Sequence, residues 1–192
     1  CALARLLRKD TSIRRGAHRL SPQGLRRPQA TSCVIMHVSE KPPPACGRSK
    51  EDSVIKDIIK DEALLSQPCE AATAEDAQVA QDLVDTLLAR DDAACLAANQ
   101  IGVAKAVVAY LDEDDKPHVM YNPVLKKALR PTKSFEACLS RDDETKVTRF
   151  EWVTVTYDEL ADGTLVPRKK VFEGWTAQLI QHMIDHCKGK LV

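Results

Sequence analysis

The 192-residue chain has no long hydrophobic run, no C-x-x-C pair and no net charge. No stretch approaches the roughly eighteen consecutive apolar residues that a membrane-spanning helix requires, so the sequence predicts no membrane segment. Its seven cysteines are odd in number and scattered, which favours a reduced compartment over a disulfide framework. With 44% hydrophobic residues the chain can still build a core, and its length is typical of one domain.

The formal charge of zero conceals an uneven distribution along the chain. Residues 1–50 contain eleven Lys or Arg against two acidic residues, a net charge of +9, so residues 51–192 carry −9. A folded part of negative charge argues against binding to DNA or other nucleic acid. The sequence therefore predicts neither a nucleic-acid partner nor a membrane partner.

Residues 1–50 also differ in composition, with eight arginines, the run Pro42–Pro44 and no sustained hydrophobic period. We expect a disordered basic tail here and a folded domain over residues 51–192. Two interpretations of the tail remain open. It is similar to a transit peptide for a mitochondrion or plastid, or the translated start is set too early and Met36 lies nearer the true one. In the second case we expect a cytoplasmic protein.

The hydrophobic spacing after residue 51 predicts an α+β domain. One helix is expected where Val54 to Leu65 recur with helical spacing, ended by Pro68. A second is expected after the N-cap Thr73, with an apolar face that reaches Leu88. Asn122-Pro123 should end a strand, and Asp162-Gly163 should form a hairpin turn. The expected strands cover residues 106–111, 118–121, 150–157 and 164–172, and a last helix, stopped near Gly189, follows them.

The last helix contains the sequence Gln181-His182-Met183-Ile184-Asp185-His186. Two histidines four residues apart project from one helix face, so they can supply two imidazole ligands to one metal ion. They border an apolar stripe, which predicts that they face an interior cleft. An isolated H-x-x-x-H pair is weak evidence for a metal site, because histidines that close a core or lie exposed have the same spacing.

Two further segments carry residues suited to catalysis or to metal binding. Leu96 to Gly102 combines small residues with Gln100, an amide donor, although a packed turn that enters a strand has the same pattern. Glu136 to Ser140 contains Cys138, which is compatible with a buried thiol, a nucleophile or a thiolate ligand. Neither segment alone decides between these alternatives.

Taken together and in this order, the three segments resemble the signatures of the peptide deformylase family. These metalloenzymes remove the formyl group from the N-terminal formyl-methionine of new polypeptides. The family's stretches G-x-G-L-A-A-x-Q-I-G, E-G-C-L-S and Q-H-E-x-D-H have counterparts at residues 93–102, 136–140 and 181–186. The similarity covers about residues 52–192. It implies an α+β fold with antiparallel β-sheets packed around a C-terminal helix that carries the histidines, plus an N-terminal helix.

The resemblance also implies a set of site residues. Cys138, His182 and His186 would bind one divalent metal ion, with Fe²⁺ favoured by the family and Zn²⁺ or Ni²⁺ also suited to these ligands. The oxyanion donors would be the Gln100 side chain and the backbone N–H of Leu139. Glu136 and Asp185 would support the ligands. The substrate-binding positions would be Cys95, Leu96 and Leu179, although Leu179 also suits a core. The implied partners are N-formylmethionyl peptides, which the protein would bind near the ribosome.

The third signature is broken at Met183, where the family carries a glutamate that takes a proton from the attacking water and delivers it to the leaving amine. A thioether cannot transfer that proton, and loss of such a group costs about 10²–10⁴ in rate. Asp185 is no substitute, because two residues along a helix turn it about 200° away. Three motif glycines are also replaced, by Ala93, Cys95 and Ala137, and a side chain is costly where positive φ or close approach is needed.

Two interpretations follow from these departures. The chain is a peptide deformylase with impaired activity, or it is a non-catalytic relative that binds metal or formyl-peptides. A zinc peptidase built on H-x-x-x-H would lack the same glutamate and would leave Cys138 and Gln100 unexplained.

Overall fold

The computed structural model describes residues 53–192, which form five strands, two helices of twelve or more residues and several short helical turns. All five strands belong to one antiparallel sheet in the order β1-β2-β3-β4-β5. The predicted α+β class is confirmed, whereas the expectations for residues 1–50 lie outside the described residues. The elements are α2 (Glu62–Leu65), η3 (Ala74–Asp76), α3 (Ala77–Leu88), β1 (Cys95–Ala97), η4 (Ala98–Ile101), β2 (Val107–Leu111), β3 (Pro117–Glu136), β4 (Thr145–Ala161), β5 (Thr164–Glu173) and α4 (Gly174–Cys187).

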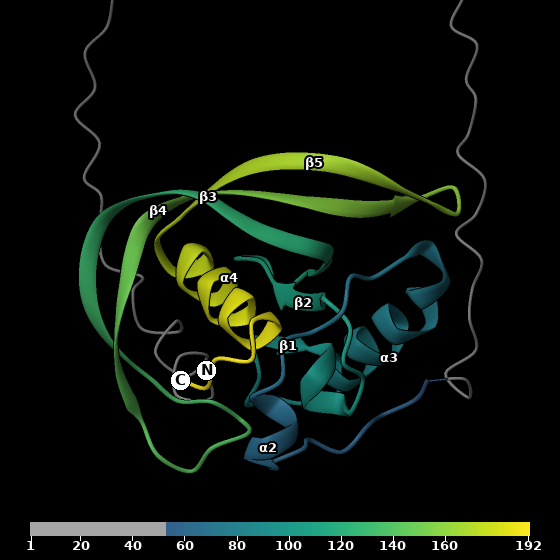
Figure 1. Cartoon of the computed structure of the whole chain (residues 1–192), viewed down its shortest axis with the longest axis horizontal. Helices are drawn as coiled ribbons and strands as arrows, with labels where there is room; N and C mark the ends of the chain where they lie inside the picture. The colour runs from purple at the N-terminus through teal and green to yellow at the C-terminus, as the bar shows by residue number, and fades with distance from the viewer. Residues whose placement is uncertain (1–52) are drawn as a thin grey trace, which may run out of the picture. The chain divides into compact units, whose positions relative to one another are not determined.

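Two apolar clusters form the core, one on each side of the short strands β1 and β2. One cluster joins α4 to the sheet, and the other joins α3 to it. All five residues of β2 are buried, as expected of a strand covered on both faces. The strands β3, β4 and β5 arch around α4, while α3 lies beside β1 and β2 (Figure 1). The sheet therefore encloses the helix that carries both histidines.

The helix predicted over residues 54–65 is wrong for most of its length, since only Glu62–Leu65 is helical. Residues 53–61 have no regular secondary structure, and two of their backbone N–H groups bond to partners distant in the sequence. Lys56 N–H donates to Thr86 Oγ1, and Ile59 N–H donates to the Gln100 carbonyl. These bonds replace those of a helix, and the aliphatic side chain of Ile55 remains 62% exposed.

Asn122-Pro123 does not end a strand as predicted, because β3 continues through it to Glu136. The pairing of β3 with β4 shifts register between Tyr121 and Val124, and Asn122 lies there at φ 52°. The Asn122 amide exchanges two hydrogen bonds with the backbone of Ala72. Tertiary contacts thus absorb the local break as a bulge.

The elements with strong local signals form as predicted. Thr73 and Asp76 make the capping box before α3, although Leu88 at its end is exposed. The Asp162-Gly163 turn has positive φ at both residues, as a type I′ hairpin requires, and connects β4 to β5. In the described part of the chain no helix is long and apolar enough to cross a membrane.

Candidate metal centre

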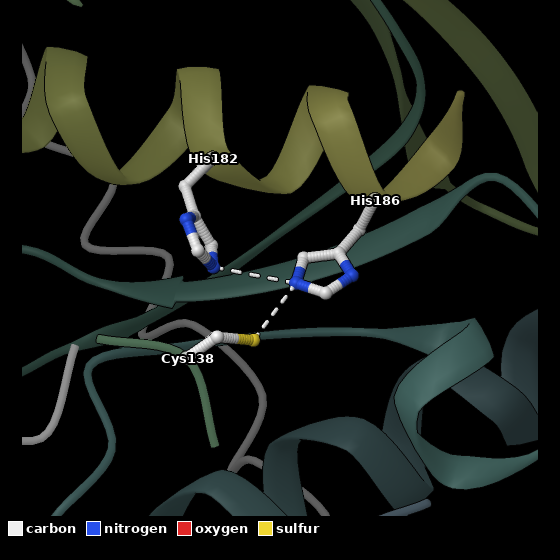
Figure 2. Close-up of side chains that lie close together, drawn as sticks. All are labelled: Cys138, His182 and His186. Atoms are coloured by element: carbon white, nitrogen blue, oxygen red, sulfur yellow. Dashed lines mark hydrogen bonds between the residues drawn. The ribbon is translucent and has the colours of Figure 1, made fainter. Parts of the chain in front are cut away.

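The structure brings together the three side chains that the sequence singled out as ligands. His182 and His186 project from neighbouring turns of α4, and Cys138 lies just after the end of β3 (Figure 2). The distance from Cys138 Sγ to His186 Nε2 is 3.2 Å, and the two Nε2 atoms lie 3.3 Å apart. The candidate ligand atoms of all three residues lie within 4.8 Å of one another.

These separations fit a single ion. Ligand bonds of about 2.0–2.3 Å at tetrahedral angles place nitrogen and sulfur ligands roughly 3.3–3.6 Å apart. One thiolate and two imidazoles are also a donor set that first-row divalent metals accept. The residues present therefore fit a divalent metal ion, which they would hold between the end of β3 and α4.

Burial keeps both imidazoles neutral, the form in which a histidine binds metal. His182 and His186 are 1% and 0% exposed. Burial, with the neighbouring His182, lowers the pKa of His186 to about 3, and burial likewise lowers the pKa of His182. The Cys138 thiol is also buried, which raises its pKa in the absence of a cation. A bound cation would favour the thiolate, so metal binding should release a proton from this side chain.

An ion-paired network fixes the ring of His182 from behind. Glu136 Oε2 lies 2.9 Å from His182 Nδ1, and this contact is a hydrogen bond that the ring donates when its proton is on Nδ1. Burial alone would raise the pKa of Glu136, but hydrogen bonds from Arg149 and His182 outweigh it and lower the pKa to about 2. The carboxylate is therefore ionised. With the proton on Nδ1, the lone pair of His182 Nε2 points to the space between the three candidate ligands, where a metal ion would bind.

Arg149 completes this network, and sequence reasoning missed it. Its guanidinium makes a bidentate pair with Glu136, at 2.8 and 2.7 Å, and bonds to Asp185 at 2.6 Å. Arg149 is only 5% exposed, so both acids pair with a desolvated cation. Nothing in its spacing distinguishes Arg149 from the surface arginines, because only the pairing of β3 with β4 brings it to Glu136 and α4.

The predicted amide donor Gln100 lies beside the thiol. Its Nε2 atom donates to Ser140 Oγ at 3.2 Å and to Cys138 Sγ at 3.6 Å, while its Oε1 accepts from the Ala97 N–H. Asn99, one residue earlier in η4, donates to the His186 carbonyl at 3.0 Å. The turn η4 therefore contacts two of the three candidate ligands, and the adjacent predicted donor Leu139 is half-buried.

The remaining predicted residues are buried in the core. Met183 and Leu179 on α4 and Cys95 on β1 belong to the apolar cluster around α4, whereas Leu96 packs in the cluster around α3. Cys95 has an ordinary negative φ, as do Ala93 and Ala137. The concern about positive φ at the replaced glycines is therefore unfounded, and only close approach remains as a reason for glycine there.

One cysteine and two neutral histidines that converge at the edge of an antiparallel sheet, two of them on one helix, define a class of metal-binding α+β protein. Within that class the sequence identifies the family, because the model of the polypeptide deformylase family matches residues 55–192 of this chain. The chain belongs to the polypeptide deformylase family.

Individual relatives agree with this assignment. The chain is 40% identical over 140 residues to a peptide deformylase of Clostridium beijerinckii, covering 72% of this chain and 100% of the relative. It is 31% identical over 146 residues to one of Maricaulis maris, covering 73% and 78%. Among solved structures, a class I type b peptide deformylase from Acinetobacter baumannii superposes with a TM-score of 0.64 at 27% identity, covering 72% of this chain and 97% of the other.

Proposed function

We propose that this protein is a metallohydrolase that removes the formyl group from N-formylmethionyl peptides, at a rate reduced by the missing acid–base residue. The observation that carries the proposal is the convergence of Cys138, His182 and His186 on one point, beside an amide donor. We further propose Fe²⁺ as the resident ion, with Zn²⁺ or Ni²⁺ as alternatives, and the cytoplasm near the ribosome as the place of action.

Each group of the site has a proposed role in the hydrolysis. A divalent ion held by the three ligands would polarise the formyl carbonyl and acidify a water molecule. The Gln100 amide and the Leu139 backbone N–H donate to the formyl oxygen as it gains negative charge. Arg149 and Glu136 hold His182 in one tautomer and one orientation. Cys95 and Leu179, in the cluster around α4, are the proposed walls for the methionine side chain. The backbone of Leu96, whose side chain packs in the cluster around α3, is the proposed contact for the peptide backbone.

Proton transfer is the step for which this chain lacks a group. A hydrolase of amides must take a proton from the attacking water and deliver one to the leaving amine. Met183 follows His182 directly but carries a thioether with no exchangeable proton. Turnover that depends on solvent for both transfers should be slower by about 10²–10⁴ than turnover with a positioned carboxylate.

A second candidate is a non-catalytic relative that binds metal or a formyl-peptide without turnover. The observation in its favour is burial, since Cys138, His182 and His186 are each no more than 5% exposed. Met183 and Cys95, two of the four departures from the motifs, lie in one apolar cluster next to this centre. A metal site that is closed on all sides serves structure more than catalysis.

Hydrolysis of a formyl-methionyl tripeptide by the full chain loaded with Fe²⁺ separates the two candidates. The first predicts slow turnover that disappears in His182→Ala, whereas the matched control His118→Ala, at a surface histidine outside the metal centre, keeps it. The second predicts that the unmodified protein binds metal but hydrolyses the peptide no faster than His182→Ala does. Turnover at ordinary enzyme rates of about 1–10³ s⁻¹ would contradict the impairment in the first candidate.

A further inference from the structure

Two cysteines outside the metal centre lie side by side where the segment after α2 crosses the end of α4. Cys69 follows Pro68, and Cys187 is the last residue of α4. The Cys69 N–H donates to the Cys187 carbonyl at 2.9 Å. A disulfide requires Cα atoms about 4.4–6.8 Å apart, and this direct backbone hydrogen bond holds the two residues close to each other.

The two side chains also interact. A hydrogen bond with the Cys187 side chain lowers the pKa of Cys69. Both cysteines are partly exposed, whereas Cys95 and Cys138, the other two cysteines in the described part of the chain, are buried. A small oxidant can therefore reach this pair while the thiol of the metal centre stays covered.

The two segments already touch so closely that little movement is needed to join them. A Cβ atom on Gly189 would lie 2.3 Å from the Ser66 carbonyl oxygen, so only glycine allows the backbones to approach in this way. Cys69 Sγ lies 4.0 Å from the carbonyl oxygen of His186. A bond at this place would fix the last turn of α4, immediately after a candidate metal ligand.

We propose that Cys69 and Cys187 are a redox-sensitive pair that forms a disulfide by exchange with a low-molecular-weight disulfide of the glutathione class. One protein thiolate attacks the small disulfide, whose S–S bond breaks and releases one small thiol. The second protein thiolate attacks the mixed disulfide and releases the second small thiol. The protein pair loses two protons and two electrons, and the small disulfide is reduced to two thiols.

The bond would close a loop of about 120 residues, which restricts the unfolded chain strongly. In a reducing compartment the pair stays as two thiols, and a shift toward oxidation links the segment after α2 covalently to α4. This inference does not depend on the proposed function, because neither thiol belongs to the metal centre.

Equilibration of the full chain in buffers of defined glutathione ratio, followed by peptide mapping, tests the proposal. We expect one new cross-linked peptide pair that contains Cys69 and Cys187, and a melting temperature raised by roughly 10 °C and restored by dithiothreitol. Cys69→Ser and Cys187→Ser should abolish the rise, and the control Cys95→Ser should keep it.

Two results would overturn the proposal. One is separate glutathione adducts on Cys69 and Cys187 without a link between them, and the other is a melting temperature that rises equally in Cys69→Ser. The mapping uses the unmodified protein, so it remains decisive even where Cys187→Ser fails to fold. Metal content and hydrolysis, measured on the same samples, keep this result separate from that of the proposed function.

Discussion

At the scale of single residues, the chemistry of this protein is decided by what surrounds His182. On one side Glu136 and Arg149 supply a charged network that holds the ring, and along the helix Met183 supplies nothing that transfers a proton. The three candidate ligands are therefore held by supporting contacts, and we propose that the acid–base function is missing. Each of these statements predicts the behaviour of a variant.

Met183→Glu should raise hydrolysis of a formyl-methionyl peptide by at least about tenfold, at the low end of the general acid–base range. The carboxylate would supply the proton transfers that the thioether cannot. Met183→Gln is the matched control, because an amide has a shape similar to that of a carboxylate but acts as neither a general acid nor a general base. Both are compared with the unmodified protein by initial rates, after circular dichroism confirms the fold. Equal rates for Glu and Gln at this position would refute the assignment.

Arg149→Met should weaken metal binding by about 10–100-fold. Without the guanidinium, Glu136 is no longer held toward His182, and two acids lose their buried partner. A competition titration with a chromophoric chelator measures the affinity. Arg168→Met is the control, since Arg168 pairs with Glu159 at the surface, where its side chain is 47% exposed. If the two variants bind metal equally well, Arg149 does not position the ligand.

At the scale of elements, the site depends on the long strand β3, which passes from the core to the metal centre and ends two residues before Cys138. The bulge at Asn122 allows one strand to pair in the core at its start and to reach the metal centre at its end. There the Asn122 side chain bonds to the N–H and carbonyl of Ala72 at 2.7 and 2.9 Å, and to Asp158 at 3.1 Å. The side chain and its positive φ each contribute to the free energy of unfolding.

Asn122→Ala should lower the free energy of unfolding by about 2–4 kcal/mol, because backbone partners lose their bonds and alanine is strained at positive φ. Asn122→Gly should cost about 1 kcal/mol less, since glycine removes only the side-chain bonds. Urea denaturation followed by circular dichroism gives both values. Alanine and glycine variants of equal stability would show that the φ angle makes no contribution.

Sequence alone predicted the elements whose signals are local. The capping box at Thr73, the Asp162-Gly163 turn and the apolar face of α3 act within a few residues, and all three are present. The segment around Ile59 was misread because its backbone bonds to η4, far away in the sequence. β3 was predicted too short for a similar reason, since the contacts that carry the strand past Asn122 are tertiary.

At the scale of the whole molecule, the centre is assembled from three parts of the chain that are distant in sequence: η4, the end of β3, and α4. Spacing alone left each of them ambiguous, and the resemblance of all three motifs in order predicted their meeting. Arg149 belongs to none of the motifs, so only the sheet register reveals it. The family match begins at residue 55, after the basic segment, so the chemistry belongs to the acidic part of the chain.

Removal of the metal should destabilise the whole fold, because the ion would connect α4 to the end of β3. At a metal concentration of 100 times the dissociation constant, binding contributes about 2.7 kcal/mol. For a protein of this size that corresponds to a loss of roughly 5–10 °C in melting temperature on chelation. A melting temperature that is unchanged by chelator and by added Fe²⁺ or Zn²⁺ would contradict this expectation.

The central claim is that one sulfur and two imidazole nitrogens bind a single divalent ion. Elemental analysis of the purified full chain tests it most directly, alongside Cys138→Ser, His186→Ala and the control Cys95→Ser. We predict close to one metal ion per chain in the unmodified protein and the control, and a large loss in the two ligand variants. A metal content that stays the same when Cys138 is replaced would contradict the claim.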